Sequence, residues 1–132
     1  NLAFPQLEDR ISIMLFTATL HRILEAQADV IAASVVSIEG LVVETVVRDT
    51  DQRDEEGQFS DAALLLGRLV DKEADFGIGA SVSLRLMSRE SVLLVRRFSK
   101  RYALALRGHA QINVGQASQC MRLSLPELAR HT

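Results

Sequence analysis

Hydrophobic residues recur along residues 6–27 with the 3.6-residue period of a helix, and they fall on two sides of it. A helix that is apolar on two sides must be covered on two sides. Its own sheet can cover one side and a second subunit the other; alternatively, a bend divides the segment into two helices that each bury one stripe. One stripe contains Leu7, Ile11, Met14, Leu15 and Ala18, and the other Ile13, Phe16, Leu20, Ile23 and Leu24.

The next apolar stretch, residues 30–47, predicts a β-hairpin. Residues 30–37 are apolar on both faces, which is typical of a central strand between two layers of helix. Glu39-Gly40 supplies the turn, because glycine tolerates a positive φ. Residues 41–47 then run back beside the first strand, so both strands are expected to be largely buried.

A polar and acidic segment, residues 48–58, follows without any periodicity and is expected to be a solvated loop or a mobile flap. The pattern then predicts a helix from Asp61 to about Asp75, with Ser60 as its N-cap and Gly77 as its stop. Its core stripe would consist of Ala62, Leu65, Leu66, Leu69 and Phe76.

Three strands are predicted in the second half of the chain. Residues 81–87 alternate, with Val82, Leu84 and Leu86 on one face. Two further strands return at residues 91–98 and 102–107, and Gly108 is expected to end the last one.

A closing helix is predicted to begin near Asn113. Ser124-Leu-Pro-Glu127 resembles a fresh helix cap with Pro126 near the first helical position. A kink or a second short helix is therefore expected there.

The predicted order is helix, two strands, helix, three strands and helix. Strands linked by hairpins pair antiparallel, so the fold class is α+β, with a five-stranded antiparallel sheet and flanking helices. A chain of 132 residues suits one domain. We expect a helical extension at residues 1–16 and a single domain at residues 17–132.

Composition narrows the function classes. Apolar residues make up 48% and charged residues 24%, and the formal net charge is −2, so no excess of positive charge favours nucleic acid. The single Cys120 cannot form an internal disulfide, which fits a reducing compartment. The apolar run at residues 11–20 is too short to span a bilayer. We therefore expect a cytoplasmic protein with no nucleic-acid partner and no membrane insertion.

The residues suggest no catalytic chemistry. The three histidines are scattered without ligand spacing, and Gly77-Ile-Gly79 lacks the last glycine of a dinucleotide fingerprint. The carboxylates of residues 49–56 lie in a polar segment that offers no buried pocket for acid or base work. We expect no catalytic residue, no metal and no cofactor, and hence no enzyme.

One cluster of charge stands out around the turn between the last two strands: Arg96, Arg97, Lys100, Arg101 and Arg107. It can be a solubilising tip that protects a sheet edge. It can also be a docking patch for an anionic partner, opposite in sign to the acidic residues Asp54, Glu55 and Glu56. An arginine finger offered to another protein's nucleotide is a third possibility.

Four stretches together support a family resemblance: the hairpin ADVIAASVVSIEGLVVETV, the helix FSDAALLLGRLVDKEADFGIG, the meander VSLRLMSRESVLLVRRFSKRYALALR and the closing run INVGQASQCMRL. Over residues 17–124 the chain resembles the Roadblock/dynein-light-chain family. Gly115 stands where the family's closing helix commonly has a glycine. The family's usual Asp-Gly turn is Glu39-Gly40 here, and the apolar segment before Thr17 is not a standard part.

The resemblance implies a Roadblock/profilin-like fold without enzymatic chemistry of its own. Such domains form homodimers or heterodimers by pairing the third strand and the second helix, and they regulate or scaffold small Ras-like GTPases or serve motor complexes. A homodimer interface would then contain Ala63, Leu64, Gly67, Val70, Ser81, Ser83 and Arg85. Docking of a GTPase would use Arg96, Arg97, Lys100, Arg101, Asp54, Glu55 and Glu56.

A different function class remains open. Sheets flanked by helices also enclose ligand pockets, so the chain could be a small-molecule sensor module. The polar residues available for such a pocket between sheet and helices are Ser34, Ser37, Thr45 and Tyr102.

Overall fold

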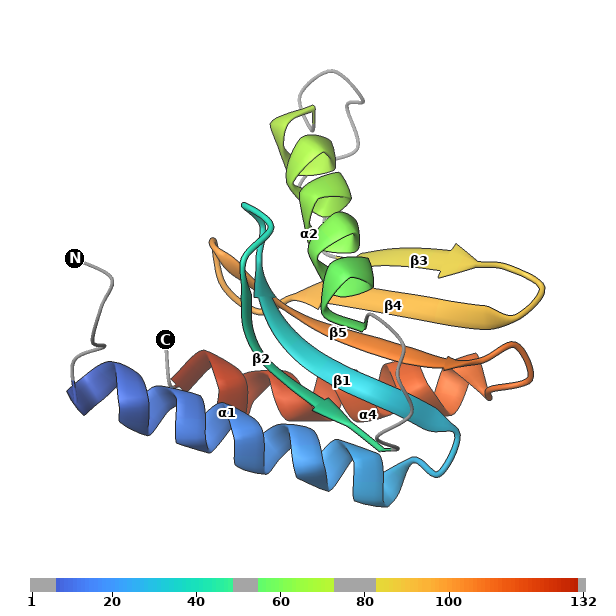
Figure 1. The fold of residues 1–132 in the computed structure, drawn as a ribbon, viewed down its shortest axis with the longest axis horizontal. Helices are drawn as coiled ribbons and strands as arrows, with labels where there is room; N and C mark the ends of the chain where they lie inside the picture. Colours follow the sequence, from blue (N-terminus) through green and yellow to red (C-terminus); the bar gives the residue numbers. More distant parts are fainter. Residues whose placement is uncertain (1–6, 49–54, 73–82, 131–132) are drawn as a thin grey trace.

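The computed structural model describes residues 7–48, 55–72 and 83–130, and it confirms the predicted α+β class (Figure 1). A five-stranded antiparallel sheet has the strand order β2-β1-β5-β4-β3. Helices α1 and α4 cover one face and α2 lies on the other (Figure 1). The elements are α1 (Leu7–Ala26), β1 (Val30–Ser37), β2 (Val42–Val47), α2 (Glu55–Asp71), β3 (Ser83–Met87), β4 (Ser91–Arg97), β5 (Tyr102–His109) and α4 (Val114–Arg130).

The two central strands, β1 and β5, separate two hydrophobic clusters. On the face covered by α1 and α4, large side chains such as Val35, Leu104 and Leu106 meet the helices. On the opposite face β5 presents Ala103 and Ala105, whose small side chains let α2 approach closely. The sheet is therefore sandwiched between helices, as the doubly apolar sequence of residues 30–37 predicts.

Helix α1 is continuous from Leu7 to Ala26, so the alternative of two segments joined by a bend is wrong. Its core stripe is the one that contains Phe16, Leu20 and Ile23, all fully or nearly fully buried. The other stripe stays on the surface, where Ile11 is 48% and Met14 is 68% exposed. The helix runs through residues 16 and 17, and a division of the chain into an extension and a domain at that point stays a prediction.

Helix α2 begins at Glu55, so the loop expected up to residue 58 and the N-cap expected at Ser60 are wrong. The earlier start buries Phe59 completely against the sheet, and the acidic Glu56 suits the positive end of the helix dipole. The Ser60 hydroxyl instead donates a hydrogen bond to the carbonyl oxygen of Gly40, 2.6 Å away.

The end of α2 also differs from the expectation. The helix ends at Asp71 rather than near Asp75, and Leu65 is partly exposed rather than in the core. Ala62 and Leu66 are buried, so their assignment to the core is confirmed. Phe76 and Gly77 lie outside the described residues.

Strand β5 continues through Gly108 to His109, beyond the predicted end. A Cβ atom at Gly108 would lie 2.5 Å from the side chain of Ile112 and 3.0 Å from the carbonyl oxygen of Asp29. Glycine therefore permits a close approach at this position rather than ending the strand.

Helix α4 begins after Asn113, whose side-chain oxygen accepts a hydrogen bond from the backbone N–H of Gln116 at 3.0 Å. The predicted start of the closing helix near Asn113 is thereby confirmed, and Asn113 is its N-cap. The helix passes through Pro126 to Arg130, so the second short helix expected there is wrong. The Ser124 hydroxyl donates to the carbonyl oxygen of Cys120 at 2.8 Å instead of capping a new helix.

The C-terminal end of α1 is held by the side chain of Arg48, the residue that follows β2. The last turn of α1 has no basic residue. The Arg48 guanidinium donates hydrogen bonds to the carbonyl oxygens of Leu24, Gln27 (2.9 Å) and Val30 (2.9 Å). A cation at this position satisfies free helix carbonyls and complements the negative end of the helix dipole.

Replacing Arg48 with alanine is expected to lower the free energy of unfolding by about 1–2 kcal/mol, because these carbonyls lose a charged donor. Arg48→Lys should lose less, since it retains the charge without the planar donor geometry. Denaturant unfolding of both variants measures the effect. An Arg48→Ala midpoint equal to that of the unmodified chain would show that the helix end does not depend on this contact.

Candidate interaction surfaces

Strand β3 is one of the two edge strands of the sheet, and β2 is the other. The outward backbone N–H and C=O groups of β3 are available to pair with a strand of another chain, as at any open sheet edge. A groove of about 370 Å³ lies between α2 and the β3–β4 hairpin. Three partly exposed hydrophobic residues line it: Leu65 of α2 and Leu86 and Met87 of β3.

The sequence pattern assigned Leu65 to the core, placed Leu86 on the same strand face as Leu84, and did not single out Met87. Alternation placed Leu86 on the inner face of β3 correctly, but α2 contacts β1, β2 and β4 and leaves β3 largely uncovered. Which strands a helix reaches depends on tertiary packing, so no local signal in the sequence marks these residues as exposed.

Four of the expected dimer-interface residues have some exposed surface. Leu64, Ser83 and Arg85 are exposed, and Val70 is half-buried. Ser81 lies outside the described residues.

Two members of that expected interface belong to the chain's own packing. Ala63 is completely buried in the cluster beneath α2, so the expectation that it contacts a partner is corrected. At Gly67 an added Cβ atom would lie 2.3 Å from the carbonyl oxygen of Ile38. The small side chain there lets α2 cross the β1–β2 turn, which explains the glycine without a partner helix.

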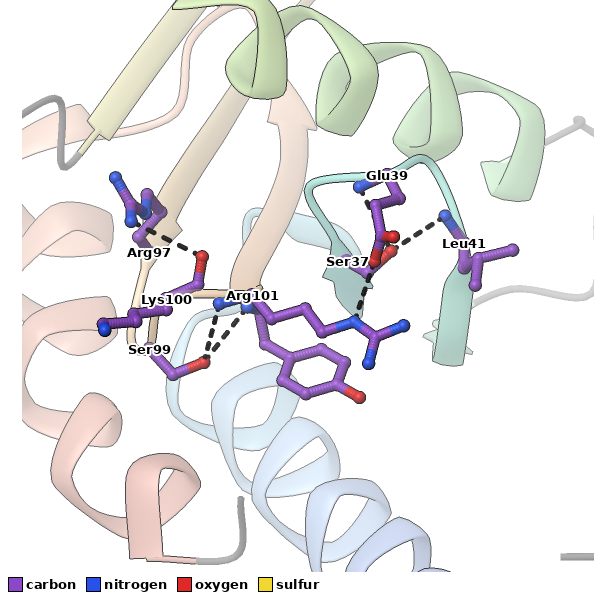
Figure 2. Close-up of polar contacts among 8 residues, drawn as sticks. Ser37, Glu39, Leu41, Arg97, Ser99, Lys100 and Arg101 are labelled. Carbon is purple, nitrogen blue, oxygen red and sulfur yellow. Dashed lines mark hydrogen bonds and ion pairs between the residues drawn. The ribbon is translucent and has the colours of Figure 1, made fainter. Parts of the chain in front are cut away.

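The β1–β2 and β4–β5 turns lie together at one end of the sheet (Figure 2). The Arg101 Nε donates to a carboxylate oxygen of Glu39 at 2.8 Å, and the backbone N–H of Ile38 donates to the Arg101 carbonyl at 2.9 Å. The Arg101 guanidinium also lies over the Tyr102 ring, 5.9 Å from its centre. The hydrogen bond with Glu39 raises the pKa of Arg101 further, so this side chain is a permanent surface cation.

Hydroxyl groups organise both turns. The Ser37 hydroxyl oxygen accepts from the backbone N–H groups of Glu39 (3.3 Å) and Leu41 (3.2 Å), and Gly40 adopts a φ of 94°. The Ser99 hydroxyl oxygen accepts from the N–H groups of Arg101 and Tyr102 (Figure 2). The predicted Glu39-Gly40 turn is confirmed, and Arg101 is presented from a rigid support.

The remaining predicted docking residues are distributed over several elements. Arg97 and Lys100 join Arg101 at the β4–β5 turn, where an Arg97 N–H donates to the Lys100 carbonyl at 3.5 Å (Figure 2). Arg96 alternates with Arg97 along β4 and so lies on the other face of the sheet. Glu55 and Glu56 form the first turn of α2, and Asp54 lies outside the described residues.

The described residues hold no group of three or more histidine, cysteine or acidic side chains close enough to bind a metal ion. Burial raises the pKa of Cys120, an effect partly offset by its hydrogen bond with Ser124. A raised pKa keeps this thiol protonated near neutral pH, which makes it a poor nucleophile. No helix within residues 7–48, 55–72 and 83–130 is long and apolar enough to cross a membrane.

The polar residues considered for a sensor pocket do not converge. Ser34 and Ser37 are buried within the sheet. The Ser34 hydroxyl donates to the Glu44 carbonyl at 2.8 Å and lies 3.0 Å from the Thr45 hydroxyl. Tyr102 stacks on Phe98, with 6.3 Å between ring centres. None of the four sensor candidates lines the groove beside β3.

Comparison with known proteins supports the same fold. No family model and no curated protein matches the sequence. Among solved structures, MglB from Myxococcus xanthus is 14% identical with a TM-score of 0.82, over 98% of this chain and 92% of that one. An MglB described with a tetrameric arrangement is 12% identical with a TM-score of 0.78, over 99% and 94% of the two chains. A Roadblock/LC7 domain from Streptomyces avermitilis is 15% identical with a TM-score of 0.69, over 86% and 94%. The resemblance read from the sequence is thus confirmed at the level of architecture, and the chain has the Roadblock/LC7 fold.

Proposed function

We propose that this chain is a non-enzymatic, dimeric regulator or scaffold that binds a small Ras-like GTPase, or a motor or signalling complex. The fold supports the proposal because it is shared with Roadblock/LC7 domains and MglB. The observation that carries it is the open edge of β3 beside α2, where Leu65, Leu86 and Met87 border an uncovered groove.

The open edge of β3 supports self-association at this surface. Two copies related by a twofold axis pair β3 with β3 and extend the sheet across both protomers. The same axis brings the two α2 helices together over the groove, which covers Leu64 and Leu65. Ser83 and Arg85 lie along the paired strand and are exposed before pairing.

GTPase docking is assigned to the joined hairpin turns. Arg97, Lys100 and Arg101 concentrate positive charge there, although the whole chain carries a net charge of −2. Charges of this kind raise the rate of encounter with an acidic surface more than they raise affinity. Binding would hold the switch segments of the GTPase in one arrangement and so bias an order–disorder equilibrium.

The test is binding to a small Ras-like GTPase encoded beside this gene, in its GDP and GTP states, together with its rate of GTP hydrolysis. Reversing two charges with Lys100→Glu and Arg101→Glu is expected to slow association by about tenfold at low salt. Arg89→Glu, on the β3–β4 turn, is the matched control and should leave association unchanged. Absence of binding in both nucleotide states would overturn the proposal.

A further inference from the structure

Strand β2 forms the edge of the sheet opposite β3, and its sequence is well suited to pairing with another strand (Figure 1). Residues 41–47, Leu-Val-Val-Glu-Thr-Val-Val, combine apolar and β-branched side chains, and Glu44 is the only charged residue among them. A short segment of this kind at a sheet edge favours uncontrolled strand pairing. Such an edge stays single only if its outward backbone groups are blocked.

The backbone of Thr45 faces this edge. In an antiparallel pair, successive residues turn their N–H and C=O groups alternately toward the neighbouring strand and away from it. The Arg48 N–H donates to the Ile31 carbonyl oxygen at 2.8 Å, so Val46 and Glu44 also face β1. Thr45 lies between them and therefore turns its N–H group away from β1, toward the open side.

The side chain of Glu44 occupies that open side. The Thr45 N–H donates to the Glu44 Oε1 at 3.0 Å. The other carboxylate oxygen accepts a hydrogen bond from the Thr17 hydroxyl of α1, which also lies 2.8 Å from the Ile13 carbonyl oxygen. Hydrogen bonds to a carboxylate are stronger than those between neutral groups. The carboxylate is thus fixed between α1 and the strand, on the N–H group that an incoming strand would use.

A strand that paired with β2 would have to offer its own carbonyl oxygen to the Thr45 N–H. It would displace the carboxylate, break a charge-assisted hydrogen bond and bring a carbonyl oxygen beside a negative charge. A β-bulge adds to this barrier. The register between β1 and β2 shifts between Val35 and Val36, and a bulge twists an edge away from a regular partner.

The β3 edge is presented differently. Its pairing with β4 is regular along the whole strand. The Ser88 N–H donates to the Ser91 carbonyl oxygen at 2.9 Å, so by the same alternation Arg85 and Met87 turn their backbone groups away from β4. Both residues are exposed, and an incoming strand can therefore reach the backbone of β3.

We infer that Glu44 determines which edge of the sheet self-associates: its carboxylate, held by Thr17, closes β2 and leaves β3 as the edge that pairs with a second copy. With both edges open, β3 of one copy would also pair with β2 of the next, a head-to-tail contact that does not close and extends into filaments. The inference rests on the proposed function for the pairing of β3, and it adds the residue that limits this pairing to two chains.

The experiment measures the mass of the full chain by sedimentation velocity over a range of protein concentrations. Glu44→Thr removes the carboxylate and keeps a side chain that favours strands. We expect two chains for the unmodified protein. For Glu44→Thr we expect a mass that rises with concentration to at least about twice that of the dimer, because the freed β2 edges link dimers end to end. Glu44→Gln should remain a dimer, since its amide oxygen still accepts from the Thr45 N–H.

Two further variants separate the causes. Glu25→Thr, at an exposed position of α1, removes the same charge from another element and should remain a dimer. Thr17→Val keeps the shape of the side chain but releases one oxygen of the Glu44 carboxylate. It should raise the mass in the same direction as Glu44→Thr, by a smaller amount. Thermal unfolding verifies that each variant is folded, and Thr17→Val carries the test if Glu44→Thr does not fold.

The outcomes distinguish this inference from the proposed function. A Glu44→Thr mass equal to that of the unmodified dimer overturns the inference and leaves the proposed dimer standing. An equal rise in mass for Glu25→Thr or for Glu44→Gln also overturns it, because loss of charge alone would then explain association. If the unmodified chain is a monomer, the proposed β3 dimer is removed, and association of Glu44→Thr alone still supports the closing role of Glu44.

Discussion

Replacing Phe59 with alanine is expected to lower the free energy of unfolding by about 3–5 kcal/mol, a large part of the stability of a small domain. Phe59 is completely buried in the cluster between α2 and the sheet. Its neighbours in that cluster include Ala32, Ala103 and Ala105, whose short side chains cannot extend into the vacated space. A cavity would therefore remain, and denaturant unfolding measures its cost.

Leu41→Ala is the matched control for this substitution. Leu41 is 60% exposed at the β1–β2 turn and lies outside the β3–α2 contact, so its loss should cost about 1 kcal/mol or less. Equal losses for the two variants would contradict the burial pattern. A negligible loss for Phe59→Ala would show that the first turns of α2 do not pack on the sheet.

The second large effect is expected for Gly67→Ala. The new methyl group would lie 2.3 Å from the carbonyl oxygen of Ile38, which is backbone and cannot rotate away. Either α2 moves off the sheet or the β1–β2 turn shifts, and we expect a loss of about 2–4 kcal/mol in the free energy of unfolding. Thermal and denaturant unfolding report the loss.

Gly115→Ala provides the comparison within a helix. An added methyl group at Gly115 meets its nearest neighbour, the Asn113 side chain, at 3.4 Å, which it can accommodate. The unfolding free energy should therefore change by no more than about 0.5 kcal/mol. If both glycine variants lose stability equally, the cause is not the approach of α2 to Ile38.

The parts of the fold that local chemistry determines could be predicted from the sequence. Glu39-Gly40 identified the first turn because glycine tolerates the positive φ that a tight connection requires. The start of α4 near Asn113 was also predicted, and the side-chain oxygen of Asn113 caps the helix there. Alternation along residues 81–87 placed Leu84 and Leu86 on one face of β3, as the register with β4 confirms.

The parts of the fold that depend on distant residues could not be predicted from the sequence. The first turn of α2 reads as a polar loop until Phe59 is seen to belong to the buried cluster between α2 and the sheet. Both stripes of α1 are apolar, and only the packing of Phe16 and Leu20 shows which one forms the core. Two grooves, one beside β3 and one between α1 and α4, arise from where the helices lie. No local feature of the sequence therefore indicates that Leu86 and Leu123 are exposed.

The central position of β1 has a consequence for synthesis of the chain. Ala33 pairs with Leu106 on β5, far along the sequence, and with Val46 on the neighbouring hairpin strand. While the polypeptide leaves the ribosome, β2 can dock early, but the opposite edge of β1 waits until residues 102–109 emerge. During that interval valines destined for the interior face water, so protection by a chaperone matters most before residues 102–109 have emerged.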